Sequence, residues 1–521
     1  MKCAQWATWV RSPVAFRGFA RSLGKLERVY FRAGVRARRL PWSAQGSETG
    51  RAKPGSEPDE LGRQKRTGPQ RVFECPSKPM QHGLNPKPSS HRTPRLITGI
   101  EPEERLLALA VEVLERADRE HPADRVLREV LHREATLSQA GAARVSRWVF
   151  QYYRWKGWLK NERGLLRKIQ KAEELAQRFN KNPFSLRAEV LRAKAVPGWV
   201  HEAMEVPDAW LRSLQREPHL YIRARPGQGR ALMESLGHLR KTYLPDAYIY
   251  EGKKDLFRTP EFAEGRFEIQ DITSQIVGHL CAPQPGENWW DACAGEGGKT
   301  LHLADLMQNR GQVWATDVAE WRLERLRRRA ARAKLFNCQT AVWDGGPKRP
   351  MPVCFDGVLV DAPCTGLGTW QRNPHARWTV QPKDVEELSG LQRRLLENVA
   401  SAVKPGGRLF YAVCTLTRAE TVEVVQAFEA AHPEFEPLPL RWPLPGLPDW
   451  QTPTLLLWPQ DTGGNGMFIA AWRRRKEAPP TRTAPVMAQL DRNKSSEAGE
   501  AESSQTLLGP ADRMSTELPA K

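Results

Sequence analysis

Residues 288–307, "NWWDACAGEGGKTLHLADLM", contain the transition that decides the main fold. A short apolar run ends at Asp291, a glycine-rich turn follows, and apolar residues then recur at helical spacing. A strand that passes through a glycine loop into a helix is typical of a nucleotide site. The ending "GGKT" suggests a phosphate-binding loop and hence an NTPase, whereas the beginning "DACAG" suggests a different ligand.

The phosphate-loop alternative lacks a residue that it needs. The pattern G-x-x-x-x-G-K-[ST] requires a glycine five residues before Gly298, and that position is Cys293. S-adenosylmethionine carries no phosphates. It needs a tight backbone turn, an acid for the ribose hydroxyls and a polar group for the adenine. The sequence therefore favours S-adenosylmethionine over ATP.

Residues suited to these three tasks occur in serial order. Gly295, Gly297 and Gly298 allow the backbone to approach a ligand closely. Asp317 ends the next apolar run and suits the ribose, as acids do in dinucleotide sites. Asp344 ends the third run and is expected to accept from the adenine amino group. One such acid could be a helix N-cap, but the ordered series indicates a cofactor site.

Strand-like and helical segments alternate from about residue 266 onward. This alternation predicts an α/β fold with a doubly wound parallel sheet and ligand sites at the carboxyl ends of its strands. The expected strands are 288–292 ("NWWDA"), 312–317 ("QVWATD"), 338–344 ("CQTAVWD"), 356–363 ("DGVLVDAP") and 407–415 ("GRLFYAVCT").

The composition points to a polyanionic partner. The chain has 521 residues and a formal net charge of +20, with 80 Lys and Arg against 60 acids. Nucleic acid is the default partner for such a surplus, although a basic soluble protein without one is the alternative. None of the 8 cysteines forms a C-x-x-C pair, and we expect a reducing compartment. No apolar run reaches the roughly 18 residues that span a bilayer, so no membrane association is expected.

Composition and periodicity divide the chain into five predicted parts. A helical region has Leu106, Leu107, Ala110, Val111 and Leu114 on one face of its first helix. The parts are a basic disordered extension (1–97), an all-helical domain (98–180), a small α/β module (181–265), the main α/β domain (266–475) and a disordered tail (476–521).

The start of the chain leaves three interpretations open. The first 40 residues contain ten Lys and Arg and one acid, Glu27. This composition fits a mitochondrial transit peptide, a disordered basic arm or a reading frame extended upstream of the true start. We expect a cytoplasmic protein, with a mitochondrial location as the alternative if the segment is a transit peptide.

Two cysteines follow the fourth and fifth expected strands. Cys364 lies in "VDAPCTGLG" and Cys414 in "YAVCTLTRAE". Both are therefore expected near the cofactor, at the carboxyl edge of the sheet. Free cysteine is often an inert core residue, but a Pro-Cys-Thr-Gly turn is typical of a loop.

These motifs together resemble the RsmB/Sun family of RNA 5-methylcytosine methyltransferases. The resemblance extends over about 205–472 and includes "FEIQDITSQIV", "DACAGEGGKT", "DAPCTG", "RNPHARW" and "GMFIAAW". Region 98–180 resembles more loosely the NusB-like RNA-binding domain of bacterial members. The chain departs from the family pattern at Glu296, where Pro is usual, at Val413, where Thr is usual, and at Asn465 and Met467 in the final motif.

The resemblance implies a role for each site residue. Cys414 is the nucleophile that attacks carbon-6 of cytosine, Cys364 assists release of the product, and Asp361 hydrogen-bonds the cytosine ring. Cys414 needs a lowered thiol pKa, and the hypothesis is that nearby Lys299 or a helix start supplies it. The implied cofactor-binding residues are Cys293, Ala294, Gly295, Glu296, Gly297, Gly298, Lys299, Asp317, Asp344 and Asp361; none is assigned to a metal.

The implied partner is RNA, and ribosomal RNA of the small subunit is expected. The target base must be single-stranded or flipped out of its helix. The alternatives are a transfer RNA cytosine-C5 methyltransferase and an inactive RNA-binding assembly factor. Intact Cys364, Cys414 and Asp361 argue against the inactive form. We expect a monomer that does not bind membranes.

Overall fold

The central sheet is built from the five expected runs and from further strands at one edge. In the computed structural model, which describes residues 102–440 and 452–477, the order is β10-β12-β9-β8-β5-β6-β7. The strands are β5 (Asn288–Asp291), β6 (Gln312–Asp317), β7 (Cys338–Val342), β8 (Phe355–Asp361), β9 (Val403–Val413), β10 (Phe435–Pro437) and β12 (Met467–Arg474), with β11 (Thr454–Leu457) paired to β12.

The sheet is mixed rather than wholly parallel. Strands β5 to β9 pair in parallel, whereas β12 runs antiparallel to β9 and β10 runs antiparallel to β12. Chain order reverses at β5, because β6 and β7 lie on one side of it and β8 and β9 on the other. Ligands of open α/β sheets bind at the carboxyl ends of the strands beside such a reversal.

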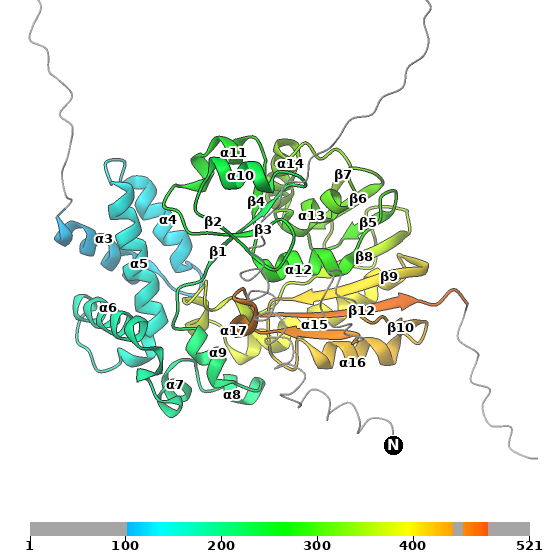
Figure 1. Cartoon of the computed structure of the whole chain (residues 1–521). Helices are drawn as coiled ribbons and strands as arrows, with labels where there is room; N and C mark the ends of the chain where they lie inside the picture. The colour runs from blue at the N-terminus through cyan, green and yellow to red at the C-terminus, as the bar shows by residue number, and fades with distance from the viewer. Residues whose placement is uncertain (1–101, 441–451, 478–521) are drawn as a thin grey trace, which may run out of the picture. The chain divides into compact units, whose positions relative to one another are not determined.

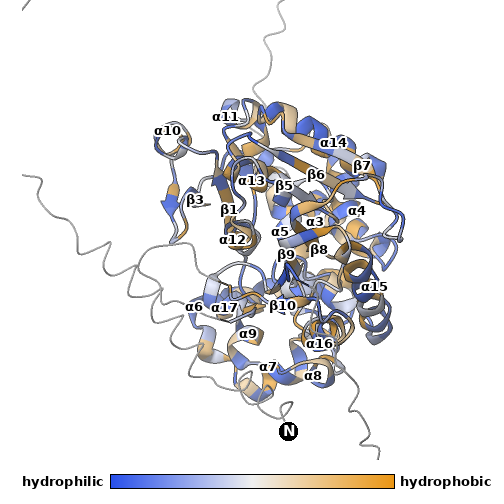
Figure 2. Cartoon of the chain, turned by 90° about the vertical axis from the view of Figure 1, so that its right-hand side faces the viewer, coloured by the Kyte–Doolittle hydropathy of each residue, from blue (hydrophilic) through white to orange (hydrophobic). Residues whose placement is uncertain are grey.

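Helices cover both faces of this sheet (Figure 1). One face packs against α12 (Ile272–Cys281), α13 (Gly298–Leu306) and α14 (Glu320–Arg332). The other packs against α15 (Pro382–Ala400) and α16 (Val422–Ala431). Most residues of the central strands are buried because parallel strands are covered on both sides. The covering helix α14 carries many hydrophilic residues, as the colouring in Figure 2 shows.

A second sheet precedes the main domain. It has the order β2-β3-β1-β4, with every pair antiparallel. The sheet confirms strands and helices in the predicted small α/β module, but its last strand, β4, lies beyond residue 265, the expected end of that module. The elements are β1 (Leu220–Ala224), α10 (Gly229–Ser235), β2 (Leu239–Lys241), β3 (Ala247–Tyr250), η3 (Leu256–Arg258), α11 (Pro260–Ala263) and β4 (Phe267–Ile269).

The region before residue 182 is helical, as the periodicity predicts. The helices are α3 (Glu103–Arg116), α4 (Ala123–Arg133), α5 (Gln139–Trp155), η1 (Lys156–Trp158) and α6 (Leu165–Lys181). On α3, Leu106, Ala110 and Leu114 are buried as expected, and Leu109 and Val113 are buried with them. Helix α5 carries several aromatic residues, and three of them belong to the core: Trp148, Tyr153 and Trp155 are each at most 3% exposed.

A group of short helices connects the helical region to the main domain. They are η2 (Pro183–Ser185), α7 (Ala188–Lys194), α8 (Val200–Ala203), α9 (Asp208–Ser213), η4 (Leu367–Thr369), η5 (Ala376–Trp378) and α17 (Pro459–Thr462). Helices α7 to α9 share a hydrophobic cluster with Leu367, Trp370 and Leu416, which lie in the loops after β8 and β9. The loops that carry the two cysteines are therefore supported by residues from much earlier in the chain.

Two buried arginines join these parts, and we call them the arginine joint: Arg154 on α5 and Arg377 in η5. The Arg377 guanidinium donates to the carbonyl oxygens of Arg154, Ala195, Leu214 and Trp370, at 3.0 to 3.3 Å. Arg154 donates to the carbonyl oxygen of Gln371 at 3.1 Å. The joint thus connects the helical region directly to the loop that follows Cys364.

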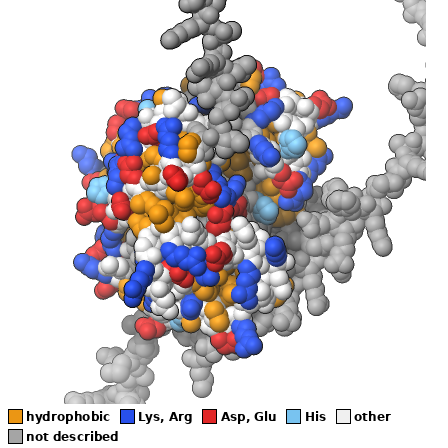
Figure 3. Space-filling view, turned by 90° about the vertical axis from the view of Figure 1, so that its left-hand side faces the viewer, with side chains coloured by type: hydrophobic (Ala, Val, Ile, Leu, Met, Phe, Trp, Pro, Cys, Tyr) orange, Lys and Arg blue, Asp and Glu red, His pale blue; other side chains and the backbone are white. Residues whose placement is uncertain are grey.

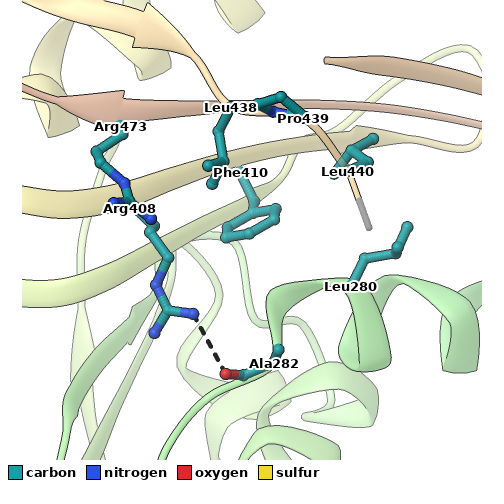
Figure 4. Close-up of a pocket in the computed structure, with 8 residues that line it drawn as sticks. All are labelled: Leu280, Ala282, Arg408, Phe410, Leu438, Pro439, Leu440 and Arg473. Atoms are coloured by element: carbon teal, nitrogen blue, oxygen red, sulfur yellow. Dashed lines mark hydrogen bonds between the residues drawn. The ribbon is translucent and has the colours of Figure 1, made fainter. Parts of the chain in front are cut away.

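No helix in the described part of the chain is long and apolar enough to cross a membrane. A cavity of about 350 Å³ lies between β9, the end of α12 and the segment after β10 (Figure 4). Its lining is largely apolar and contains none of the predicted site residues. The lining residues are Leu280, Ala282, Arg408, Phe410, Leu438, Pro439, Leu440 and Arg473.

Candidate active site

The loop between β5 and α13 has the tight turn that the sequence predicts. Gly295 and Gly297 have φ values of 55° and 85°, a region that favours glycine. A Cβ at Gly297 would also lie 2.5 Å from Cγ of Leu326. Glycine is therefore required at this position both for backbone conformation and for packing.

Asp317 lies beside this loop, at the end of β6. Its carboxylate accepts from the amide of Gly295 at 3.0 Å and from the amide of Ala319 at 2.9 Å. The side chain is 7% exposed. These contacts fix the carboxylate next to the glycine turn, where it can accept hydrogen bonds from two vicinal hydroxyls of a ribose.

Asp344 does not end a strand, contrary to the expectation. Strand β7 ends at Val342, and Asp344 is exposed in the turn that follows. Its side chain accepts from the amide of Gly346 at 2.8 Å, as aspartates often do in turns. The apolar residues of 338–344 predict a strand over the whole range. Trp343 is apolar because it packs into the core from the loop, after the strand has ended.

The other predicted loop residues have structural contacts. Cys293 packs against the sheet core, and burial raises the pKa of its thiol. The amide of Ala294 donates to Thr316 at 2.8 Å, and the carbonyl of Gly298 accepts from Gln270 at 3.1 Å. Glu296 forms an ion pair with Arg325 at 2.6 Å. The residue that departs from the family pattern is thus tied to α14 by its side chain.

Lys299, which is buried, and Asp361, which is partly exposed, form an ion pair at the carboxyl edge. Lys299 Nζ lies 2.6 Å from Asp361 Oδ2 at the end of β8. Burial alone would lower the pKa of Lys299, but the charge of Asp361 and the hydrogen bond to it outweigh burial and raise it. Lys299 therefore stays a cation beside Asp361.

The structure brings the two predicted cysteines together. Sγ of Cys364, in the loop after β8, lies 3.3 Å from Sγ of Cys414, which follows β9. The hydrogen bond to Cys414, burial and the charge of Glu420 together raise the pKa of Cys364 well above its ordinary value. The raised pKa keeps the Cys364 thiol protonated at neutral pH, so it is able to donate to Cys414.

Glu420 was not singled out from the sequence, although it lies in the quoted stretch "YAVCTLTRAE". It is 0% exposed, and its two carboxylate oxygens accept four hydrogen bonds from the loops around the cysteines and one from Gln392 on α15. Sequence alone offers a weak signal, since an acid before an apolar helix reads as an exposed residue of the first turn.

The sheet order, the antiparallel β12 and the cofactor loop define a class I S-adenosylmethionine-dependent methyltransferase. The 16S rRNA methyltransferase RsmB/F family model matches residues 279–473. A Synechocystis sp. protein named "Probable ribosomal RNA small subunit methyltransferase B" is 33% identical over 339 residues, which are 60% of this chain and 74% of that protein. The chain belongs to the RsmB/F family of RNA methyltransferases and uses S-adenosylmethionine.

Other relatives match a smaller part of their own length. The Bacillus subtilis protein with the same name is 35% identical over 219 residues, which are 41% of this chain and 49% of that protein. The Thermus thermophilus ribosomal RNA small subunit methyltransferase B is 37% identical over 212 residues, 40% of this chain and 50% of that protein. The crystal structure of PH0851 has a TM-score of 0.57 at 24% identity and covers 71% of this chain and 97% of that one, which supports the fold.

Proposed function

We propose that this protein methylates carbon-5 of a cytosine in small-subunit ribosomal RNA. The observation that carries the proposal is the contact between Cys364 and Cys414 beside the Lys299–Asp361 pair. Two thiols and a cation at the carboxyl edge of a methyltransferase sheet suit covalent activation of a pyrimidine. The relatives named above support ribosomal RNA as the substrate class.

The residues of the cofactor loop fit S-adenosylmethionine. Bound there, the cofactor supplies an electrophilic methyl group. Asp317 is placed for the ribose hydroxyls, and the glycine turn admits the backbone close to the ligand. The exposed Asp344 remains a proposal for the adenine amino group, because it can still accept with the oxygen that Gly346 does not use.

Cys414 begins the reaction at carbon-6 of the cytosine. Its thiolate forms a carbon–sulfur bond, and the electron pair of the 5,6 double bond moves so that carbon-5 becomes nucleophilic and takes the methyl group. Lys299 stabilises the thiolate before attack. Asp361, held by Lys299, accepts a hydrogen bond from the protonated ring nitrogen of the adduct.

Release requires the same bond to break. Carbon-5 gives its proton to a solvent water, the electron pair of the carbon–hydrogen bond re-forms the 5,6 double bond, and the carbon–sulfur bond breaks so that Cys414 leaves as a thiolate. Cys364 lies 3.3 Å from that sulfur and keeps its own proton, so its S–H stabilises the leaving thiolate. This arrangement supports the assignment of Cys414 as nucleophile and Cys364 as the residue that assists release.

We propose that both the helical region and the N-terminal residues contribute to RNA binding. The helical region, for which we propose a NusB-like role, does not present a basic patch on the face in Figure 3: Lys and Arg lie among Asp and Glu. Many of these arginines are ion-paired, for example Arg133 with Glu112 at 2.6 Å. Residues 1–100, which lie outside the described part, contribute 20 of the 80 Lys and Arg. We propose that they add non-specific phosphate affinity.

The test compares the wild type with Cys414→Ala and Cys364→Ala. Each protein is incubated with methyl-labelled S-adenosylmethionine and an unmodified small-subunit ribosomal RNA, and the products are resolved on a denaturing gel. We expect the wild type to label cytosine, Cys414→Ala to be inactive and Cys364→Ala to trap a protein–RNA band. Methylation by Cys414→Ala would show that the nucleophile is wrong.

A transfer RNA substrate is the second candidate, and the same assay with transfer RNA decides between them. Labelling of transfer RNA but not of ribosomal RNA would overturn the substrate. The absence of label in any RNA would favour an inactive assembly factor. We further propose a monomer in the cytoplasm, to be checked by light scattering and by localisation of the tagged full chain, with a mitochondrial signal supporting a transit peptide.

A further inference from the structure

The loop that carries Cys364 is held largely by one buried carboxylate. Thr365, the next residue, donates to Glu420 through its backbone amide at 2.8 Å and through its hydroxyl at 2.5 Å. The side chain of Gln392 on α15 donates both to Glu420 at 3.1 Å and to the carbonyl of Pro363 at 2.9 Å. Both residues that flank Cys364 are thus connected to Glu420, directly or through one side chain.

The same carboxylate holds the loop that carries Cys414. The hydroxyls of Thr415 and Thr417 each donate to Glu420 Oε2 at 2.9 Å. The hydroxyl of Tyr411 on β9 donates to the backbone carbonyl of Glu420 at 2.7 Å, which fixes the position of Glu420 itself. A buried carboxylate with this many donors is satisfied and therefore rigid.

We propose that Glu420 is a positioning residue that sets the distance between the two cysteine thiols and thereby controls release of the methylated RNA. The inference rests on the proposed function, because it assigns Glu420 to the step in which Cys364 assists the departure of Cys414. Glu420 does not touch the reacting atoms. It acts through Thr365 on one loop and through Thr415 on the other.

The two loops do not depend on Glu420 equally. Cys414 directly follows β9, whose last residue, Val413, is registered against Phe468 of β12. The carbonyl oxygen of Cys414 also accepts from the amide of Gly368 at 3.0 Å. Cys364 has no such ladder beside it, since β8 ends at Asp361. Loss of Glu420 should therefore displace Cys364 while Cys414 keeps its place.

This asymmetry predicts a specific defect. Variants of Glu420 should carry out the first methyl transfer, which needs Cys414, and then accumulate the covalent protein–RNA adduct. For Glu420→Ala we expect steady-state turnover to fall on the order of 10²-fold, the effect of a misplacement of about 1 Å. Glu420→Gln keeps the size and most hydrogen bonds, so its turnover should fall roughly tenfold.

The experiment measures four quantities on the full chain: S-adenosylmethionine affinity, single-turnover methyl transfer, steady-state turnover and the fraction of enzyme in the adduct on a denaturing gel. The matched control is Glu429→Gln, a half-buried acid on α16 whose carboxylate accepts from Trp472 at 3.1 Å, outside the cysteine loops. The control should behave like the wild type in all four.

An increased adduct fraction in the Glu420 variants, with unchanged cofactor affinity, supports the inference. Turnover equal to that of the control overturns the inference. A fall in both cofactor affinity and first methyl transfer, without accumulation of the adduct, also overturns it, because that result indicates general damage to the site. If Glu420→Ala does not fold, Glu420→Gln decides by the same criteria. A wild type that labels no cytosine refutes the proposed function instead.

Discussion

Glu420, between the cysteine loops, and Arg377, in the arginine joint, are each 0% exposed, and they are stabilised in parallel ways. Glu420 accepts five hydrogen bonds, and Arg377 donates to four carbonyl oxygens. Within 102–440 and 452–477, neither has an ion-pair partner. Neutral dipoles rather than opposite charges therefore hold both.

The hydrogen-bond partners of Glu420 and Arg377 differ in how far apart they lie in the sequence. Every side chain and amide bound by Glu420 lies between Thr365 and Thr417, within the main domain. Arg377 joins carbonyls from residue 154 to residue 370. Burial lowers the pKa of Arg377 well below its ordinary value, so the cation is under strain that its four acceptors must offset. Glu420 therefore positions two neighbouring loops of the main domain, whereas Arg377 holds separate parts of the chain together.

The largest expected effect tests the joint. Arg377→Met leaves four buried carbonyls without their donor, and we expect a loss of more than about 3 kcal/mol in the free energy of unfolding. Urea denaturation followed by tryptophan fluorescence measures it. A loss below about 1 kcal/mol would mean that water replaces the guanidinium and that Arg377 does not hold the parts together.

A buried acid with few donors sharpens the contrast with Glu420. Asp291 accepts from Thr300 Oγ1 at 2.7 Å, and its other oxygen has no hydrogen-bond partner in the described part of the chain. Burial raises its pKa to about 7. The folded state then holds a proton that the unfolded state, with a pKa near 4, has lost.

The sign follows from this difference. The contribution of Asp291 to the free energy of unfolding should be fully present below pH ~4, fall by up to about 1.4 kcal/mol per pH unit as the pH rises, and level off above about 7. Asp291→Asn should remove that part of the slope. We would compare urea midpoints of the two proteins from pH 4 to 8; parallel curves would show that Asp291 is charged throughout.

A smaller effect distinguishes the two members of the joint. Arg154 donates to one carbonyl, that of Gln371, where Arg377 donates to four. Arg154→Met should therefore cost about 1–3 kcal/mol, less than Arg377→Met. The ranking is measured by urea denaturation under the same conditions. A reversed order would place the centre of the joint on α5.

The smallest effect is expected at an exposed ion pair. Arg128 lies 3.1 Å from Asp124 on α4, and its side chain is 70% exposed. Arg128→Met should change the free energy of unfolding by no more than about 1 kcal/mol. The variant is also the matched control for Arg377→Met, because it removes the same side chain where water replaces the lost contact. A loss comparable to that of Arg377→Met would invalidate the comparison.

The sequence could predict the features that depend on neighbours in the chain. The expected strands and the glycine turn are confirmed because burial on both faces and positive φ leave local signatures. Chain order at the carboxyl edge was enough to bring Cys364 near Cys414. Asp344 was misplaced because strand ends cannot be read from apolar residues alone, and Trp343 is apolar without being in the ladder.

Features that depend on distant segments could not be predicted. Glu420 is buried only because the loops after β8 and β9 and helix α15 come together around it. Nothing in "TLTRAE" indicates that its carboxylate will accept five hydrogen bonds. Arg377 lies in "RNPHARW", which resembles a family motif, but its acceptors come from carbonyls that any sequence would supply. Backbone acceptors leave no trace in residue identity.

The close approach of Gly368 and Gly466 has a consequence for the timing of synthesis. A Cβ on Gly368 would lie 2.2 Å from the Gly466 oxygen, and the Gly466 amide donates to Gly368 at 2.8 Å. Gly466 precedes β12, the strand that pairs with β9 next to Cys414. A nascent chain that has not yet emerged beyond β12 has both cysteines but lacks the segment that completes their surroundings. The surroundings of the two cysteines are therefore complete only once β12 has been synthesised.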